Sequence, residues 1–221
     1  KIPQSNGEYR IDYRSTDNVE NTSKPKRMVV YMDLEKPVSD YVFDGPTFML
    51  RDTLYITTRT HLRLPATDKY STVKVVNYKR DTDPQKVFSS PFVIQGRGFH
   101  EVIFHAIDQV NNREENRRVA FVVDDRPPQI FSHLSANKYE DIRQGGEVLG
   151  VYPQLTQIFL AATDDISGTK AIWYTINGGK EMPFVGSIKG LKEGIYTIDI
   201  RAQDNVTNES RSRVRFAIGR F

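Results

Sequence analysis

The chain has 221 residues, of which 38% are hydrophobic and 27% are charged, with a formal net charge of +3 and a pI near 9.0. This length suits two domains, and the composition is that of a folded chain rather than a disordered one. The absence of cysteine excludes disulfides, cysteine zinc sites and thiol catalysis. No apolar run is long enough to cross a membrane as a helix. The weakly basic net charge does not indicate a nucleic-acid partner.

The first predicted element is a β-hairpin that recurs twice along the chain. Residues 7–21, 98–112 and 194–208 share one pattern, in which side chains alternate with the period of two that is typical of strands. The face expected to point into the core carries Tyr9, Ile11 and Tyr13 in the first copy, His100, Val102 and Phe104 in the second, and Tyr196, Ile198 and Ile200 in the third. The other face, which includes His105 and Arg201, is expected to be solvated.

Each copy ends in the pattern Asp-x-x-x-Asn, which predicts a tight turn before a returning strand. Asp and Asn side chains can bond the backbone two residues on, and Asn tolerates a positive φ. A calcium site is the alternative, but the turn alone supplies too few of the six to eight oxygens that this ion takes. The predicted turn residues are Asp17 and Asn21, Asp108 and Asn112, and Asp204 and Asn208.

The spacing of the copies predicts the domain organisation. The glycines that open them, Gly7, Gly98 and Gly194, lie 91 and 96 positions apart, close to the length of one β-sandwich domain. We therefore expect an all-β chain of tandem antiparallel β-sandwiches joined by short Pro-containing linkers. The expected domains are residues 1–33, the C-terminal hairpin of a truncated repeat, and then residues 34–125 and 126–221.

The first segment needs a packing partner, because an isolated hairpin is marginally stable in water. We accordingly interpret the chain as part of a longer polypeptide or assembly. In the middle domain we expect strands near residues 40–43, 48–50, 54–58, 72–78 and 88–94. In the last domain we expect an irregular polar stretch at 135–146 and strands near 129–131, 148–152, 157–162 and 172–176. Asn177-Gly178 predicts a hairpin turn.

The last repeat resembles a known type of module. Its pattern Gly-x-Tyr-x-Ile-x-x-x-x-x-Asp-Asn-Val-x-Asn, with residues 158–164, Ser167-Gly168 and 172–178, resembles the Ig-like repeats of bacterial exported and surface proteins, among them repeats of spirochaete outer-membrane-associated proteins. The resemblance implies tandem Ig-like domains outside the cytoplasm (cell surface, periplasm or secreted). It also implies a non-enzymatic spacer and adhesion or partner-docking role, with no cofactor and with a protein or polysaccharide of the cell envelope as partner.

One tryptophan and a run of arginines are the candidate contact residues. Trp173 has the opposite parity to its apolar neighbours on the predicted strand 172–176, so we expect it on the outer face near Arg201. It could stack on a sugar ring or anchor a protein contact, or instead pack on arginine stems. Three further arginines alternate on the last strand and could bind acidic glycans or lipid headgroups, or protect a sheet edge. They are Arg211, Arg213 and Arg215.

No nucleophile motif, phosphate loop or metal-ligand spacing is present, and we expect no catalysis. Asp164 and Asp165 are open to two interpretations, part of a calcium site or a solvated turn. Thr60-His61 is expected at the matching place of the middle domain, so we do not expect such a site to be shared by the repeats. The alternative function is a glycan-binding accessory region of a larger secreted enzyme, which requires a ligand at Trp173.

Overall fold

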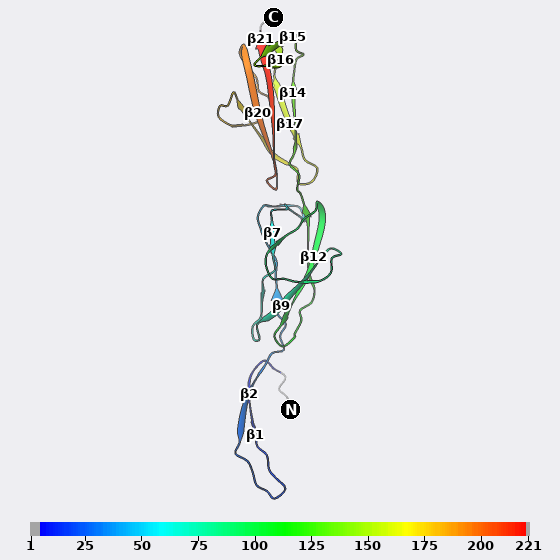
Figure 1. Ribbon diagram of the computed structural model, residues 1–221, viewed down its shortest axis with the longest axis vertical. Coiled ribbons are helices and arrows are strands. Elements are labelled where there is room, and N and C mark those ends of the chain that lie inside the picture. The colour runs from blue at the N-terminus through cyan, green and yellow to red at the C-terminus, as the bar shows by residue number, and fades with distance from the viewer. Residues whose placement is uncertain (1–4, 220–221) are drawn as a thin grey trace. The chain divides into compact units, whose positions relative to one another are not determined.

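The computed structural model describes residues 5–219, and within this range the chain forms β-strands and no helix (Figure 1). No element able to span a membrane as a helix occurs there. By its contacts the chain divides into two compact units. The first comprises residues 5–44, 61–93 and 100–120, and the second comprises residues 45–60, 94–99 and 121–219. The domain boundaries that we propose, 34–125 and 126–221, follow the sequence repeat rather than this division.

The first unit begins with the hairpin of β1 (Gly7–Tyr13) and β2 (Lys26–Met32), which pair antiparallel with Gly7 opposite Met32. Apolar side chains of this hairpin, among them Ile11 and Met28, are exposed. That exposure agrees with the expectation that the hairpin needs a packing partner.

The rest of the first unit consists of strands of unequal length around a small core. The side chains of Leu62 and Phe104 are fully buried, and the rings of Tyr78 and Phe92 stack with 4.6 Å between centroids. One group of strands is β9 (Val73–Arg80) with β10 (Lys86–Val87) and β12 (Gly98–Asp108), and β13 (Arg117–Val123) follows in sequence. A second group is β7 (His61–Arg63) with β4 (Val42–Asp44) and β11 (Phe92–Val93), and β3 (Val38–Ser39) pairs with β8 (Ala66–Thr67).

The second unit contains the last repeat as a β-sandwich. Its larger sheet has the order β15-β16-β21-β20-β18-β19, and β14 pairs with β17 in the smaller one. These strands are β14 (Gln129–Leu134), β15 (Glu140–Gln144), β16 (Glu147–Pro153), β17 (Ile158–Thr163), β18 (Thr169–Ile176), β19 (Met182–Pro183), β20 (Gly194–Asp204) and β21 (Glu209–Gly219). The long strands β20 and β21 run side by side (Figure 1). The strands β5 (Thr47–Leu50) and β6 (Thr53–Ile56) also belong to this unit.

Two features of the sheets differ from the sequence expectation. Within residues 5–219, β6 pairs with β13 and β16 pairs with β21 in parallel orientation. In addition, the stretch 135–146 is not wholly irregular, because β15 forms within it and pairs with β16. The side chains of β15 are mostly polar because both faces of this edge strand lie largely at the surface.

The core of the last repeat confirms the predicted inward face of β20. Ile198 and Ile200 are buried, while Asp199 between them and Arg201 after them are only partly covered. Phe216 is fully buried, and the rings of Tyr152 and Tyr196 pack against it with centroid distances of 6.1 and 5.9 Å. Burial of these apolar side chains is the main source of stability for this sandwich.

The Asp-x-x-x-Asn turns form as predicted in all three copies. The backbone N–H of Asn21, Asn112 and Asn208 donates to Oδ1 of the preceding Asp at 2.9, 2.7 and 2.7 Å. Positive φ falls on the residue before each Asn rather than on the Asn itself. These residues are Glu20, Asn111 and Thr207, with φ of 67°, 72° and 70°.

Both histidines of β12, His100 and His105, are largely buried, although only His100 was expected on the inward face. His100 is mostly buried and bonds Asp81 through Nδ1 at 2.7 Å, as expected for an inward residue. His105, expected on a solvated face, is buried, because Asn77 on β9 lies opposite it and Arg113 lies beside it. Burial lowers the pKa of His105, and the positive charge of Arg113 lowers it further.

Candidate functional site

The five candidate contact residues lie on one face of three neighbouring strands. In the register of β18, β20 and β21, Trp173 lies opposite Arg201, and Arg201 lies opposite Arg211. In the same register Asp199 lies opposite Arg213, and Thr197 lies opposite Arg215. Strand pairing therefore gathers these residues as the alternation predicted, although their role in binding stays a prediction.

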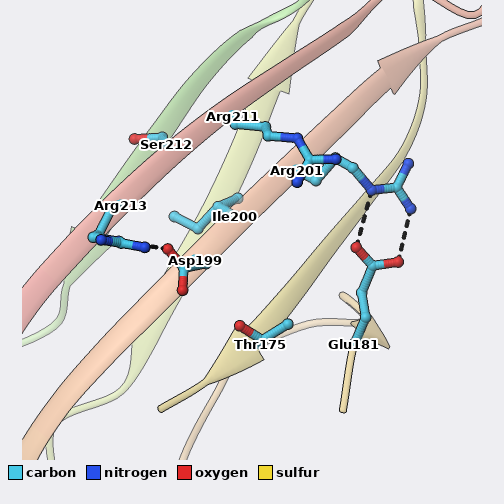
Figure 2. Close-up of a pocket in the computed structure, with 8 residues that line it drawn as sticks. All are labelled: Thr175, Glu181, Asp199, Ile200, Arg201, Arg211, Ser212 and Arg213. Carbon is cyan, nitrogen blue, oxygen red and sulfur yellow. Dashed lines mark hydrogen bonds and ion pairs between the residues drawn. The ribbon is translucent and has the colours of Figure 1, made fainter. Parts of the chain in front are cut away.

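A hollow of about 610 Å³ lies over this face (Figure 2). Arg201 and Glu181, which both line it, point toward one another and form two parallel hydrogen bonds of 2.9 and 2.8 Å. Arg213 reaches Asp199 at 2.6 Å. The residues that line the hollow are Thr175, Glu181, Asp199, Ile200, Arg201, Arg211, Ser212 and Arg213.

The face has mixed charge, although Arg211, Arg213 and Arg215 alternate along it. Besides its bonds to Glu181, Arg201 contacts Glu209 at 2.7 Å, and Arg215 pairs with Glu147. The alternation of arginines was visible in the sequence, but the acidic partners of Arg213 and Arg215 come from other strands. Arg211 is the least neutralised of the set, because its side chain is 77% exposed and lies 4.0 Å from Glu209.

Trp173 is covered by an arginine rather than fully exposed. The guanidinium of Arg201 lies 4.0 Å from the centre of its ring, a cation–π arrangement. This geometry fits the interpretation that Trp173 packs on an arginine. A sugar ring could stack on this face of Trp173 only after Arg201 had moved and given up its bonds to the glutamates.

Protection of a sheet edge also fits part of the arginine run. Strand β16 pairs with β21 only through Ala217–Gly219, so the stretch of β21 that carries Arg211 and Arg213 has a strand on one side alone. Charged side chains on such an unpaired edge oppose pairing with another chain. Binding of an anionic partner and protection of the sheet edge are therefore compatible roles for these arginines.

The pairing of Glu181 with Arg201 gives a pH-dependent expectation. Hydrogen bonding to Arg201 lowers the pKa of Glu181 below its ordinary value of 4.5. Because the folded-state pKa is the lower one, the pair contributes its full stability above pH 4.5 and loses it as the pH falls through the folded pKa. We expect Glu181→Gln to lower the urea midpoint of Trp173 fluorescence at pH 7, and we expect this difference to disappear in strong acid. A difference that persisted at all pH values would contradict an electrostatic origin.

Two groups of three carboxylates could hold a metal ion. They are Asp33, Asp68 and Asp108 in the first unit, and Asp124, Asp164 and Asp204 in the second. Asp68 occupies the place that Asp164 has in the last repeat, so the expected match of Thr60-His61 to this place is wrong. The signal was present in the sequence, because Asp68 and Asp164 lie 96 positions apart, as do Gly98 and Gly194.

Comparison with protein-family models found no match, and comparison with curated proteins found none either. Among solved structures, the chain is similar to fibronectin(III)-like modules of CbhA from Clostridium thermocellum, with 15% identity, a TM-score of 0.40, and coverage of 82% of this chain and 95% of that one. It is also similar to the D00-D0 domain of intimin, with 11% identity, a TM-score of 0.33, and coverage of 80% and 100%. These similarities are too distant to indicate a function, and the all-β sandwich fold follows from the strand pairing itself.

Proposed function

We propose that the chain is a run of non-enzymatic Ig-like modules from an exported bacterial protein. In this proposal residues 34–125 and 126–221 act as spacer domains, and the face around Arg211 docks a partner at the cell envelope. The sequence resemblance to repeats of surface proteins, including those of spirochaetes, supports a location outside the cytoplasm. The β-strand architecture of both repeats supports a structural role.

The observation that carries the docking role is the hollow on the outer face of the last sandwich. Tryptophan and arginine are the residue types that most often dominate binding energy at protein interfaces. Here Arg201, Arg211 and Arg213 line the hollow, the ring of Trp173 lies against Arg201, and the side chain of Arg211 stays exposed. An anionic group of a partner, either a carboxylate of an acidic polysaccharide or an acidic side chain, is the chemistry that this arginine would recognise. The glycan-accessory alternative is less favoured, because the ring of Trp173 is already covered by Arg201.

The docking role can be tested with Trp173 fluorescence, since this is the only tryptophan of the chain. We expect polygalacturonate to produce a saturable change that neutral dextran does not produce. Arg211→Ala should weaken the binding about tenfold, the loss of roughly one charge-assisted hydrogen bond.

Arg143→Ala is the matched control, because Arg143 is an exposed arginine of the same sandwich and its removal changes the net charge equally. Equal weakening by both variants would reveal non-specific attraction and contradict a site at Arg211. If neither polysaccharide gives a response, the anionic-glycan form of the docking proposal fails and the spacer role remains.

A further inference from the structure

Two groups of aspartates occupy equivalent places in the two repeats. In each group, one carboxylate oxygen per residue lies within 4.8 Å of the corresponding oxygens of the other two. Asp33 and Asp124 lie 91 positions apart, and the other two pairs lie 96 apart. We call Asp33, Asp68 and Asp108 the first triad, and Asp124, Asp164 and Asp204 the second triad.

The first triad contains carboxylate oxygens that are buried and lack a partner. Asp33 is 8% exposed, and its Oδ2 has no hydrogen bond within the described chain, while its Oδ1 accepts the N–H of Glu35 at 3.0 Å. Asp68 repeats this arrangement, because its Oδ1 accepts backbone N–H groups of its own loop and its Oδ2 is buried without a partner. No basic side chain of residues 5–219 forms an ion pair with this triad.

The second triad is built by the same hydrogen bonds. Oδ1 of Asp164 accepts the N–H of Gly168 at 2.7 Å, and its Oδ2 is again buried without a partner. Asp124 and Asp204 are fully buried. The side chain of Asn208 donates to the carbonyl oxygen of Asp124 at 3.1 Å, as Asn112 does to that of Asp33 at the same distance.

Three clustered aspartates of this kind are energetically unfavourable when no cation is bound between them. Burial of a carboxylate without a partner is costly, and like charges at this separation repel one another. Arg97 compensates for charge near the second triad, but its ion pairs are with Asp125 and Asp165 rather than with the triad.

We propose that each triad binds one divalent cation, and that the ion is Ca²⁺. The donors are all carboxylate oxygens, which suit Ca²⁺ or Mg²⁺ rather than a metal that prefers nitrogen or sulfur. Ca²⁺ accepts irregular geometry and six to eight oxygens, so water or carbonyl groups complete its shell, whereas Mg²⁺ demands a near-ideal octahedron. The ion accounts for the unpartnered oxygens and ties Asp33 and Asp124 to the loops that carry the other two residues.

The Asp-x-x-x-Asn turn by itself is not the site. In the first copy, Asp17 makes the same hydrogen bonds to Asn21, yet it is exposed and belongs to neither triad. This supplies an internal control, because Asp17 shares the turn chemistry of Asp108 and Asp204 and lacks the neighbouring carboxylates.

The test is calcium titration of the full chain by isothermal calorimetry after treatment with EDTA. We expect two sites with dissociation constants of roughly 0.1 to 1 mM, the range of extracellular calcium modules, and weaker binding of Mg²⁺. Asp68→Asn and Asp164→Asn should each leave one site, and the double variant should leave none. Asp17→Asn should retain both.

Thermal unfolding separates loss of the ion from loss of the fold. Without cation, Asp68→Asn should melt at or above the wild-type temperature, because the substitution removes a repelling charge. With 10 mM CaCl₂, the wild type should rise by several degrees and overtake the variant. Absence of calcium uptake by the wild type, retention of two sites in the double variant, or equal affinity for Mg²⁺ would overturn the proposal.

Discussion

Phe216→Ala is expected to destabilise the last sandwich by about 3 to 5 kcal/mol. The side chain is 1% exposed and belongs to a cluster with Ile158, Ile198 and Ile218, so its removal loses transfer free energy and leaves a cavity. Urea unfolding followed by the fluorescence of Trp173 measures this directly, because the tryptophan lies in the same sandwich. With an m-value of about 2 kcal/mol/M, the midpoint should fall by roughly 2 M.

Phe159→Ala provides the control for this substitution. Phe159 lies on β17 of the same sandwich but is 43% exposed, so its truncation should cost less than about 1 kcal/mol. Similar midpoints for the two variants would contradict the assignment of Phe216 to the core.

Glu114→Ala is expected to have the largest effect among the polar substitutions, with a loss of about 2 to 4 kcal/mol. This buried carboxylate, 8% exposed, accepts the N–H of Ala106 at 2.6 Å and that of Ser39 at 3.1 Å, and it also bonds the hydroxyl of Ser39. Truncation leaves these buried donors without an acceptor. Hydrogen exchange should detect faster exchange at the amides of Ser39 and Ala106, and circular dichroism should detect earlier melting.

The neighbouring residue is a matched control of the same type. Glu115 is 90% exposed and contacts Lys36 at 2.9 Å, a surface ion pair of little energetic weight. Glu115→Ala should therefore leave both measurements nearly unchanged. If Glu114→Ala behaved like Glu115→Ala, the buried hydrogen bonds would not contribute to stability.

Much of the local structure could be predicted because its causes are local. Alternation with period two identifies strands such as β20, and it separates Ile198 and Ile200 from Asp199 and Arg201 without reference to the rest of the chain. The Asp-x-x-x-Asn turn was equally accessible, because its hydrogen bonds close within one short segment.

The candidate sites were less predictable because their parts meet only through pairing. Alternation put Arg211, Arg213 and Arg215 on one face, but it could not supply Asp199 and Glu147, which neutralise two of them. His105 was likewise assigned to a solvated face, although neighbours from other parts of the chain bury it.

The sequence by itself thus determined the all-β class, the repeat and the inward faces of β12 and β20, since each depends on periodicity along the chain. The tertiary structure alone decided which polar groups matter. It buried Glu114 and exposed Glu115, and it brought Asp33, Asp68 and Asp108 together across 75 positions of sequence. The physical reason is that burial and charge proximity depend on neighbours supplied by distant segments, and neither is encoded in the local pattern around any one residue.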